Sequence, residues 1–218
     1  MIKSKIKTMP EQIALSLKND IFKGAFIPGQ KLKEKEIAAK YGTSRTPVRE
    51  SFRVLEREGL ISFLPNKGAF VALISKKEVV EIFELRKLIE TYCIRKFIST
   101  AQPKAFEELG QLFEKMKKAL MNGDFSDCLS CSIDFHFFIV NHLSNDSMSN
   151  LFNTMRCKIR CAQALLYFNK TRTFYEHIVE LHQDLFDSIS KREEYCEKIL
   201  SRHLEDCCEE ICENFKLL

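Results

Sequence analysis

Three arginines recur at intervals of four residues in the N-terminal third of the chain. Arg45, Arg49 and Arg53 fall on one face of a helix at this spacing, whereas Val48 and the apolar residues after it face a core. The arginines of a helix placed in the DNA major groove can donate two hydrogen bonds each to guanine O6 and N7. The spacing alone fits a solvated basic face equally well. A helix that reads bases in double-stranded DNA is predicted only together with the charge of this segment and its flanking elements.

Charge is divided unevenly along the chain of 218 residues. Residues 1–75 hold 14 Lys and Arg against 7 Asp and Glu, whereas residues 76–218 hold 20 against 23. A basic segment followed by a mildly acidic one is typical of a polyanion-binding module joined to a second function. No apolar run approaches the roughly 18 residues of a membrane helix, and the N-terminus lacks the apolar stretch of a secretory signal. We therefore expect a cytoplasmic protein without a membrane partner.

The elements around the arginines predict a winged helix-turn-helix over residues 1–74. Apolar residues recur at helical spacing in residues 8–24, 35–41 and 44–58, and Gly42 breaks the last two helices apart. Two short apolar segments, 60–64 and 69–73, then flank a turn and predict a hairpin. Its tip, Lys67-Gly68, could reach the DNA backbone or the minor groove.

Residues 75–218 predict an antiparallel bundle of helices. Ser75 and Glu78 have the spacing of a capping box at the start of the first helix. The apolar stripe of that helix comprises Val79, Ile82, Phe83, Leu85, Leu88 and Ile89. The predicted helices cover about residues 76–99, 103–123, 125–143, 145–168, 171–190 and 192–218. Their short connections favour antiparallel neighbours, so the chain as a whole is predicted to be mostly α.

The N-terminal segment closely resembles the winged-helix domain of GntR-type bacterial transcription regulators. The matching stretches are Pro28–Leu32, Glu34–Ala38, Ser44–Glu50, Leu55–Ile61 and Lys67–Val71. The resemblance implies DNA contacts from Lys35, Arg45, Thr46, Arg49, Lys67 and Gly68, together with Ser44 at the start of the arginine helix. The family usually has Arg at the position of Lys35, and Lys keeps the charge without the planar fork.

The C-terminal segment resembles, more loosely, the fatty-acid-regulator-like C-terminal domain (FCD) of the same family. Phe135-His136, His182 and His203-Leu204 match positions at which this domain places metal ligands. The resemblance implies that these three histidines bind a divalent metal such as Zn or Ni. Imidazoles from three helices can converge on one cation and leave a position open for a small carboxylate. The remaining two, His142 and His177, are expected at the surface or at helix ends.

One departure from the FCD pattern affects the charge of this site. The family has an Asp ligand four residues before the first histidine, and Ser132 stands there in this chain. A site of three histidines and a divalent cation carries +2 instead of +1, which weakens cation binding and strengthens attraction for an anion. We expect the effector near Ser132, with Arg86, Arg156 and Arg160 as candidate partners for its carboxylate. Arg86 has a structural alternative, an ion pair with Glu90 one turn away.

Nine cysteines, an odd number, are distributed over the chain. Without an export signal we expect reduced thiols. Cys128 and Cys131 form a single C-x-x-C pair, and the others follow helical spacing among apolar residues. Small buried hydrophobic residues are the favoured interpretation, with a thiol redox sensor as the alternative.

The sequence as a whole predicts a transcription regulator, not an enzyme. A homodimer on a pseudo-palindromic operator is expected, because one recognition helix reads few base pairs. A small organic acid would shift the population competent for operator binding, most simply by relieving repression. Two alternatives remain: a regulator that responds to an acyl chain without metal, and a three-histidine metallohydrolase. The histidines could also be core residues that bind a ligand through N–H groups.

Overall fold

The computed structural model describes residues 7–163 and 171–215. Its contacts divide the chain into two compact units, Met1–Ile74 and Ser75–Leu218. The first combines short helices with a small sheet and the second is helical, so the predicted fold class is confirmed. Among the described helices, none is both long enough and apolar enough to cross a membrane.

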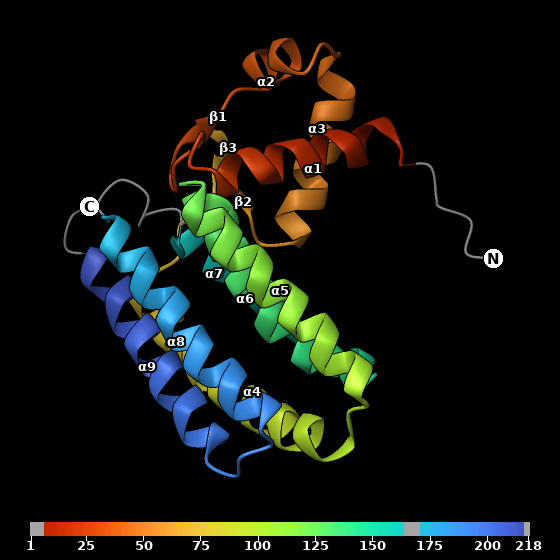
Figure 1. Cartoon of the computed structure of the whole chain (residues 1–218). Helices are drawn as coiled ribbons and strands as arrows, with labels where there is room; N and C mark the ends of the chain where they lie inside the picture. The colour runs from red at the N-terminus through yellow and green to blue at the C-terminus, as the bar shows by residue number, and fades with distance from the viewer. Residues whose placement is uncertain (1–6, 164–170, 216–218) are drawn as a thin grey trace. The chain divides into compact units, whose positions relative to one another are not determined.

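The N-terminal unit is a winged helix-turn-helix (Figure 1). Its elements are α1 (Met9–Phe22), β1 (Lys31–Leu32), α2 (Glu34–Lys40), α3 (Arg45–Arg57), β2 (Ile61–Leu64) and β3 (Gly68–Val71). The buried side chains of its core include Leu17, Ile21, Ile37, Val48, Phe52, Leu55 and Leu60. These residues come from all three helices and from the start of the hairpin, so the core fixes how α3 is presented.

The turn between α2 and α3 depends on Gly42. This residue has a φ of 62°, which a glycine adopts without steric cost. The N–H of Thr43 then donates to the carbonyl of Ala38 at 2.9 Å and closes the end of α2. Ser44 follows in an extended conformation as the N-terminal cap residue of α3. The arginine helix therefore starts where the sequence predicts.

The wing contains one strand more than the predicted hairpin. Strands β2 and β3 pair antiparallel with Ile61 opposite Val71 and Leu64 opposite Gly68. β1 pairs with the other edge of β3, which gives the strand order β1-β3-β2. Two residues are too few to show an alternating pattern, so sequence periodicity does not reveal this strand. Its pairing ties the segment before α2 to the wing.

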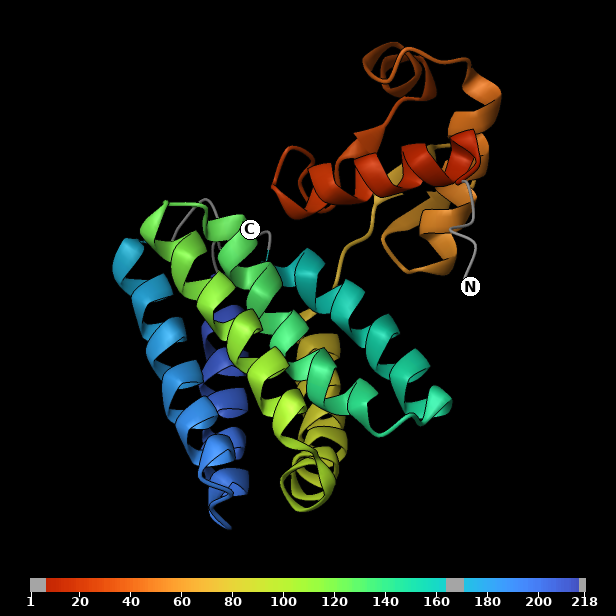
Figure 2. The ribbon, with the colours of Figure 1, turned by 45° about the vertical axis from the view of Figure 1, so that its right-hand side comes forward.

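The C-terminal unit is a bundle of helices (Figures 1 and 2). Its described helices are α4 (Lys76–Thr100), α5 (Pro103–Met121), α6 (Phe125–His142), α7 (Asp146–Gln163), α8 (Arg172–Ser190) and α9 (Cys196–Asn214). Helix α5 packs on α6 and α8, and α4 packs on α9 and α6. The predicted end of the fourth helix, near residue 168, lies outside the described residues.

Both ends of α4 have specific hydrogen bonds. At its start, the Glu78 N–H donates to the Ser75 hydroxyl at 3.1 Å, and the Ser75 N–H donates to the Glu78 carboxylate at 3.2 Å. At its end, the Arg192 guanidinium donates to the carbonyls of Ile98 and Ala101. Arg192 itself has a φ of 56°, which an α-helix does not allow, and it lies in the connection between α8 and α9. The prediction that the last helix begins at about Arg192 is therefore wrong, since α9 begins at Cys196.

The predicted apolar stripe of α4 is correct in its first turns and wrong further along. Val79, Ile82 and Phe83 are buried, but Leu85 and Leu88 are 43% and 71% exposed. Arg86 and Glu90 are buried instead, because they form an ion pair that is 2.6 Å long. Mutual neutralisation allows two charged residues to occupy inward positions that a count of apolar residues assigns to leucines.

Candidate functional site

The face of α3 opposite the core carries the residues predicted to contact DNA. Arg45, Thr46 and Arg49 are exposed on α3, and Ser44 is exposed at its cap. Val48, Phe52 and Leu55 are fully buried on the other side and hold the helix in place. The row of polar and basic side chains is therefore presented by a rigid support.

The remaining predicted DNA contacts lie on two other elements of this unit. Lys35 is exposed in the first turn of α2. Lys67 and Gly68 are exposed at the tip of the wing, where Gly68 has a φ of 94°. A backbone in this conformation strongly favours glycine, so a side chain at position 68 would strain the turn.

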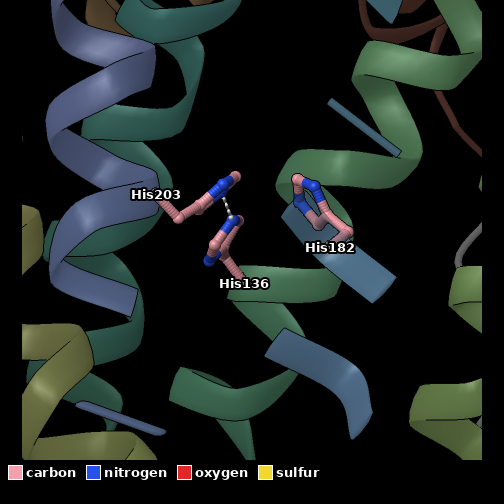
Figure 3. Close-up of side chains that lie close together, drawn as sticks. All are labelled: His136, His182 and His203. Atoms are coloured by element: carbon pink, nitrogen blue, oxygen red, sulfur yellow. Dashed lines mark hydrogen bonds between the residues drawn. The ribbon is translucent and has the colours of Figure 1, made fainter. Parts of the chain in front are cut away.

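The three predicted metal ligands meet inside the helical unit (Figure 3). His136 comes from α6, His182 from α8 and His203 from α9. One nitrogen of each ring lies within 4.8 Å of the others. The Nε2 atoms of His136 and His203 are 3.0 Å apart, and no ring is more than 2% exposed. Three separate helices, of which α8 and α9 follow one another in the sequence, thus place three imidazoles around one point.

The hydrogen-bond partners of the outer ring nitrogens determine whether each inner nitrogen carries a proton or a lone pair. His136 Nδ1 lies 2.7 Å from Glu90 Oε2, and His182 Nδ1 lies 2.8 Å from the carbonyl of Ile178. Both partners accept hydrogen bonds, so each Nδ1 carries a proton and each Nε2 carries a lone pair. His203 Nδ1 lies 4.0 Å from the Cys207 sulfur, a weak acceptor. The inner nitrogens of His136 and His182 are therefore arranged as ligands for a cation.

Burial keeps the three imidazoles neutral. It is the largest influence on each ring, and it lowers the pKa of His182 to about 3 and the pKa of His203 well below the usual value. Burial also lowers the pKa of His136, against the opposing effect of Glu90. Neutral imidazole is the form that binds metal. With the His136 proton on Nδ1, the 3.0 Å contact between the two Nε2 atoms puts the proton of His203 on its inner nitrogen, so this proton moves to Nδ1 when His203 binds a metal.

Glu90 connects the histidine cluster to Arg86. Its Oε1 accepts from Arg86 Nε at 2.6 Å, while its Oε2 lies beside His136. Burial alone would raise the pKa of the Glu90 carboxyl, but Arg86 and His136 together hold it below the ordinary value. Glu90 is thus an anion that balances the Arg86 charge and fixes the ring of His136.

The four candidate effector residues have different surroundings. The Ser132 hydroxyl lies 3.1 Å from His182 Nε2, at the edge of the cluster, and Arg86 reaches the cluster through Glu90. Arg156 pairs with Asp134 at 2.9 Å and lies over the ring of Phe137. Arg160 is buried on α7. The structure therefore places Ser132 beside a predicted ligand and engages Arg86 in the ion pair that the sequence offers as its alternative.

A cleft between α8 and α9 leads to the cluster. It has a volume of about 540 Å³, and His203 forms part of its wall. The other lining residues include Ser188, two basic residues and three carboxylates: Lys191, Arg202, Asp184, Asp187 and Glu193. The Ser188 hydroxyl is buried and has no hydrogen-bond partner among the described residues. Of the three clustered histidines, His203 is the one that lines this cleft.

Two protein-family models match this chain, one in each unit. The model described as "Bacterial regulatory proteins, gntR family" matches residues 10–71, and the model of the FCD domain matches residues 81–206. The chain belongs to the GntR family. Members of this family are transcription regulators and not enzymes, so the metallohydrolase alternative is wrong.

Individual relatives agree with the family assignment. The GntR-family chain is 28% identical over 194 residues to the HTH-type transcriptional regulator YdhC of Bacillus subtilis (strain 168). The matched region covers 88% of this chain and 86% of YdhC. It is 27% identical over 206 residues to the HTH-type transcriptional repressor RspR of Escherichia coli (strain K12). That match covers 92% of this chain and 88% of RspR.

Solved structures share the fold of this GntR-family chain. A GntR transcriptional regulator from Rhodococcus sp. RHA1 superposes with a TM-score of 0.84 at 20% identity, over 94% of this chain and 98% of that chain. E. coli McbR/YncC gives a TM-score of 0.83 at 21% identity, over 96% and 100%.

The cysteines of this GntR-family member lie mostly in the protein interior. All nine lie in the described residues and outside disulfides, and all but Cys207 and Cys208 are buried. Burial raises the pKa of Cys128 to about 12 and that of Cys131 to about 11, so their C-x-x-C pair holds protonated thiols. A thiolate is the reactive form, which favours a packing role for this pair over redox sensing.

Two acidic residues contact candidate site residues in ways that the sequence does not predict; the spacing indicates Glu90 only as a partner of Arg86. Glu90 bonds His136, and Glu34 on α2 pairs with Arg49 on α3 at 2.8 Å. The signal for Glu90 is a carboxylate at an inward helical position, four residues after Arg86. No spacing rule links Glu34 to Arg49, because the two residues lie on different helices.

Proposed function

We propose that this regulator binds its operator through α3 and the wing. Arg45, Thr46 and Arg49 read base edges, with Ser44 at the helix start, while Lys35, Lys67 and Gly68 contact the backbone or the minor groove. The observation that carries the proposal is the exposed row of arginines on a helix whose opposite face is fully buried. A rigid helix of this kind can hold its arginines in register with base pairs.

Arg49→Ala should weaken binding to the preferred duplex by about 5- to 150-fold and relax the preference at one base pair. The reason is that arginine can donate to two guanine acceptors at once and alanine to none. Titration of labelled duplexes selected from a random library measures both effects. Arg172→Ala, which removes an exposed arginine from α8, serves as the control. Wild-type affinity and base preference in Arg49→Ala would remove Arg49 from the reading face.

We also propose that the regulator acts as a homodimer on a pseudo-palindromic operator. Leu85, Leu88 and Tyr92 are 43%, 71% and 47% exposed on one side of α4, where they form an apolar strip. A second copy can present the same strip to the first about a two-fold axis. Such an axis also pairs two recognition helices on two half-sites, which supplies the base pairs that one helix cannot read.

Leu88→Glu should weaken dimerisation by at least about 10-fold, because it places a carboxylate at the centre of an apolar contact. Sedimentation equilibrium at micromolar concentration measures the association constant. Met121→Glu makes the same change at an exposed residue at the end of α5 and should leave association intact. Equal dimerisation of the two variants would place the interface elsewhere.

We further propose that His136, His182 and His203 hold a divalent metal, Zn or Ni, that anchors a small carboxylate. Three buried, neutral imidazoles whose inner nitrogens converge support this assignment, and the Ser132 hydroxyl lies beside His182 Nε2. One metal with bonds of 2.0–2.1 Å places its ligand atoms roughly 3.3 Å apart, a separation within reach of the observed ring positions. The effector would enter through the α8–α9 cleft, past His203.

Binding of the effector is proposed to relieve repression in the cytoplasm. The relative RspR is named a transcriptional repressor, which supports repression as the state that the effector would relieve. The alternative is a metal-free pocket for an acyl chain. The α8–α9 cleft argues against it, because most of its lining residues are charged or polar, with Asp184, Asp187 and Arg202 among them.

A further inference from the structure

A carboxylate holds the guanidinium of Arg49 from behind. Arg49 Nε lies 2.8 Å from both Oε1 and Oε2 of Glu34. The Arg49 side chain is 66% exposed, whereas that of Glu34 is 28% exposed. Glu34 is thus the more fixed member of the pair. It lies in the first turn of α2, which the buried residues Ile37 and Ala38 anchor to the core.

The atoms used in this pair leave the reading edge of the guanidinium available. Glu34 takes the Nε–H, and the two terminal amino groups of an arginine lie on the other edges of the planar group. Guanine O6 and N7 can accept from these amino groups at the same time as the carboxylate accepts from Nε. The ion pair and the base contact are therefore compatible.

We propose that Glu34 is a positioning residue that increases the base specificity of Arg49. This inference rests on the proposed base contact by Arg49. A flexible arginine can exchange a base contact for a phosphate contact, which binds every sequence equally. The Glu34 carboxylate restrains the guanidinium in one plane, and its negative charge also repels the DNA backbone. Both effects penalise non-specific binding, so Glu34 raises discrimination instead of affinity.

The opposite role would be a latch in which Glu34 competes with DNA for Arg49. A latch would use the donors that guanine needs, so that the pair must break before the base is read. The observed contact on Nε does not require this. The two roles also differ in measurable ways, since removal of a latch strengthens binding to the preferred duplex.

The test compares the full-length chain with Glu34→Ala, Glu34→Gln and Glu36→Ala. Glu36 lies on the same helix and pairs with Lys33 at 2.8 Å, so its removal makes the same change in charge without touching Arg49. Duplexes are selected from a randomised library with the wild-type chain. The affinity of each variant is then measured for the selected duplex and for duplexes changed at one base pair at a time, at several salt concentrations.

Glu34→Ala should lower discrimination by about 2- to 5-fold, the range that an exposed ion pair supplies. The loss should be confined to the base pair that Arg49→Ala ceases to read. Glu34→Gln keeps an oxygen that accepts from Nε and should retain most of this discrimination. Both Glu34→Ala and Glu36→Ala should bind random duplexes more tightly at low salt, because each removes a negative charge.

Two results would overturn the inference while leaving the DNA contact of Arg49 intact. One is tighter binding of Glu34→Ala to the selected duplex with unchanged base preference, as a latch requires. The other is equal behaviour of Glu34→Ala and Glu36→Ala at every base pair. If Arg49→Ala itself keeps every base preference, the proposed contact fails, and the role of Glu34 fails with it.

Discussion

Glu90→Gln should destabilise the helical unit by about 3–5 kcal/mol, because it leaves the buried Arg86 guanidinium without a counter-charge. Arg86 and Glu90 are each 4% exposed or less, so water cannot replace the lost partner. The glutamine carbonyl can still accept from His136 Nδ1 and has nearly the volume of the original side chain. The effect is therefore that of an unpaired charge and not of a cavity. Chemical denaturation followed by circular dichroism measures it.

Two variants separate this explanation from a general sensitivity of α4. Glu197→Gln removes the partner of Arg95, an exposed ion pair between α4 and α9, and should leave the midpoint nearly unchanged because water screens that pair. The double variant Arg86→Met, Glu90→Gln removes the buried positive charge as well and should recover most of the lost stability. Loss of stability in the double variant equal to that in Glu90→Gln would contradict the unpaired-charge argument.

Helices α3 and α4 show where prediction from the sequence succeeds and where it fails. Val48 and Phe52 are buried and Arg45 is exposed on α3, as the spacing predicts, because an apolar face on one short helix leaves a single way to pack. On α4 the pattern is ambiguous, since a neutralised Arg86–Glu90 pair can be buried in place of Leu85 and Leu88. The spacing of residues within α4 carries no information about His136 on α6, whose contact with Glu90 helps to keep the polar pair buried.

The candidate sites show a similar division. The resemblance to FCD domains selects His136, His182 and His203, and the structure brings them together, although whether they bind metal stays a prediction. The partners that orient them are less visible in the sequence. Glu90 is 46 residues from His136, and the acceptor for His182 is a backbone carbonyl. Contacts of this kind arise from helix packing, and neither the spacing of residues nor their type predicts them.

Added zinc should stabilise the chelator-treated wild-type chain, and His182→Ala should abolish this response. At a zinc concentration 100 times the dissociation constant, binding to the folded state alone adds about 2.7 kcal/mol. For a unit of this size, this gain corresponds to a rise of about 5–10 °C in Tm. His182→Ala removes one of three ligands and leaves two imidazoles with a much weaker hold on the ion. Differential scanning calorimetry with and without zinc measures both proteins.

The design needs controls because His182 is fully buried and its truncation leaves a cavity. His182→Gln keeps more of the volume, lacks the imidazole and should also lose the zinc response. His177→Ala changes an exposed histidine on the same helix and should respond to zinc as the wild-type chain does. Absence of any shift in the wild-type chain with either Zn²⁺ or Ni²⁺ would reject the metal assignment, whatever the variants show.

The carboxylate anchor adds a second stage to the same experiment. Acetate, a small monocarboxylate that chelates free zinc only weakly, should raise the Tm of the zinc-loaded wild-type chain further, since an anion is attracted to a buried site with a charge of +2. Without zinc the cluster of neutral imidazoles lacks that charge, so acetate should have little effect. If acetate and other small carboxylates stabilise the metal-free chain equally, the acid binds through protein groups. The histidines would then act as hydrogen-bond partners of the effector and not as metal ligands.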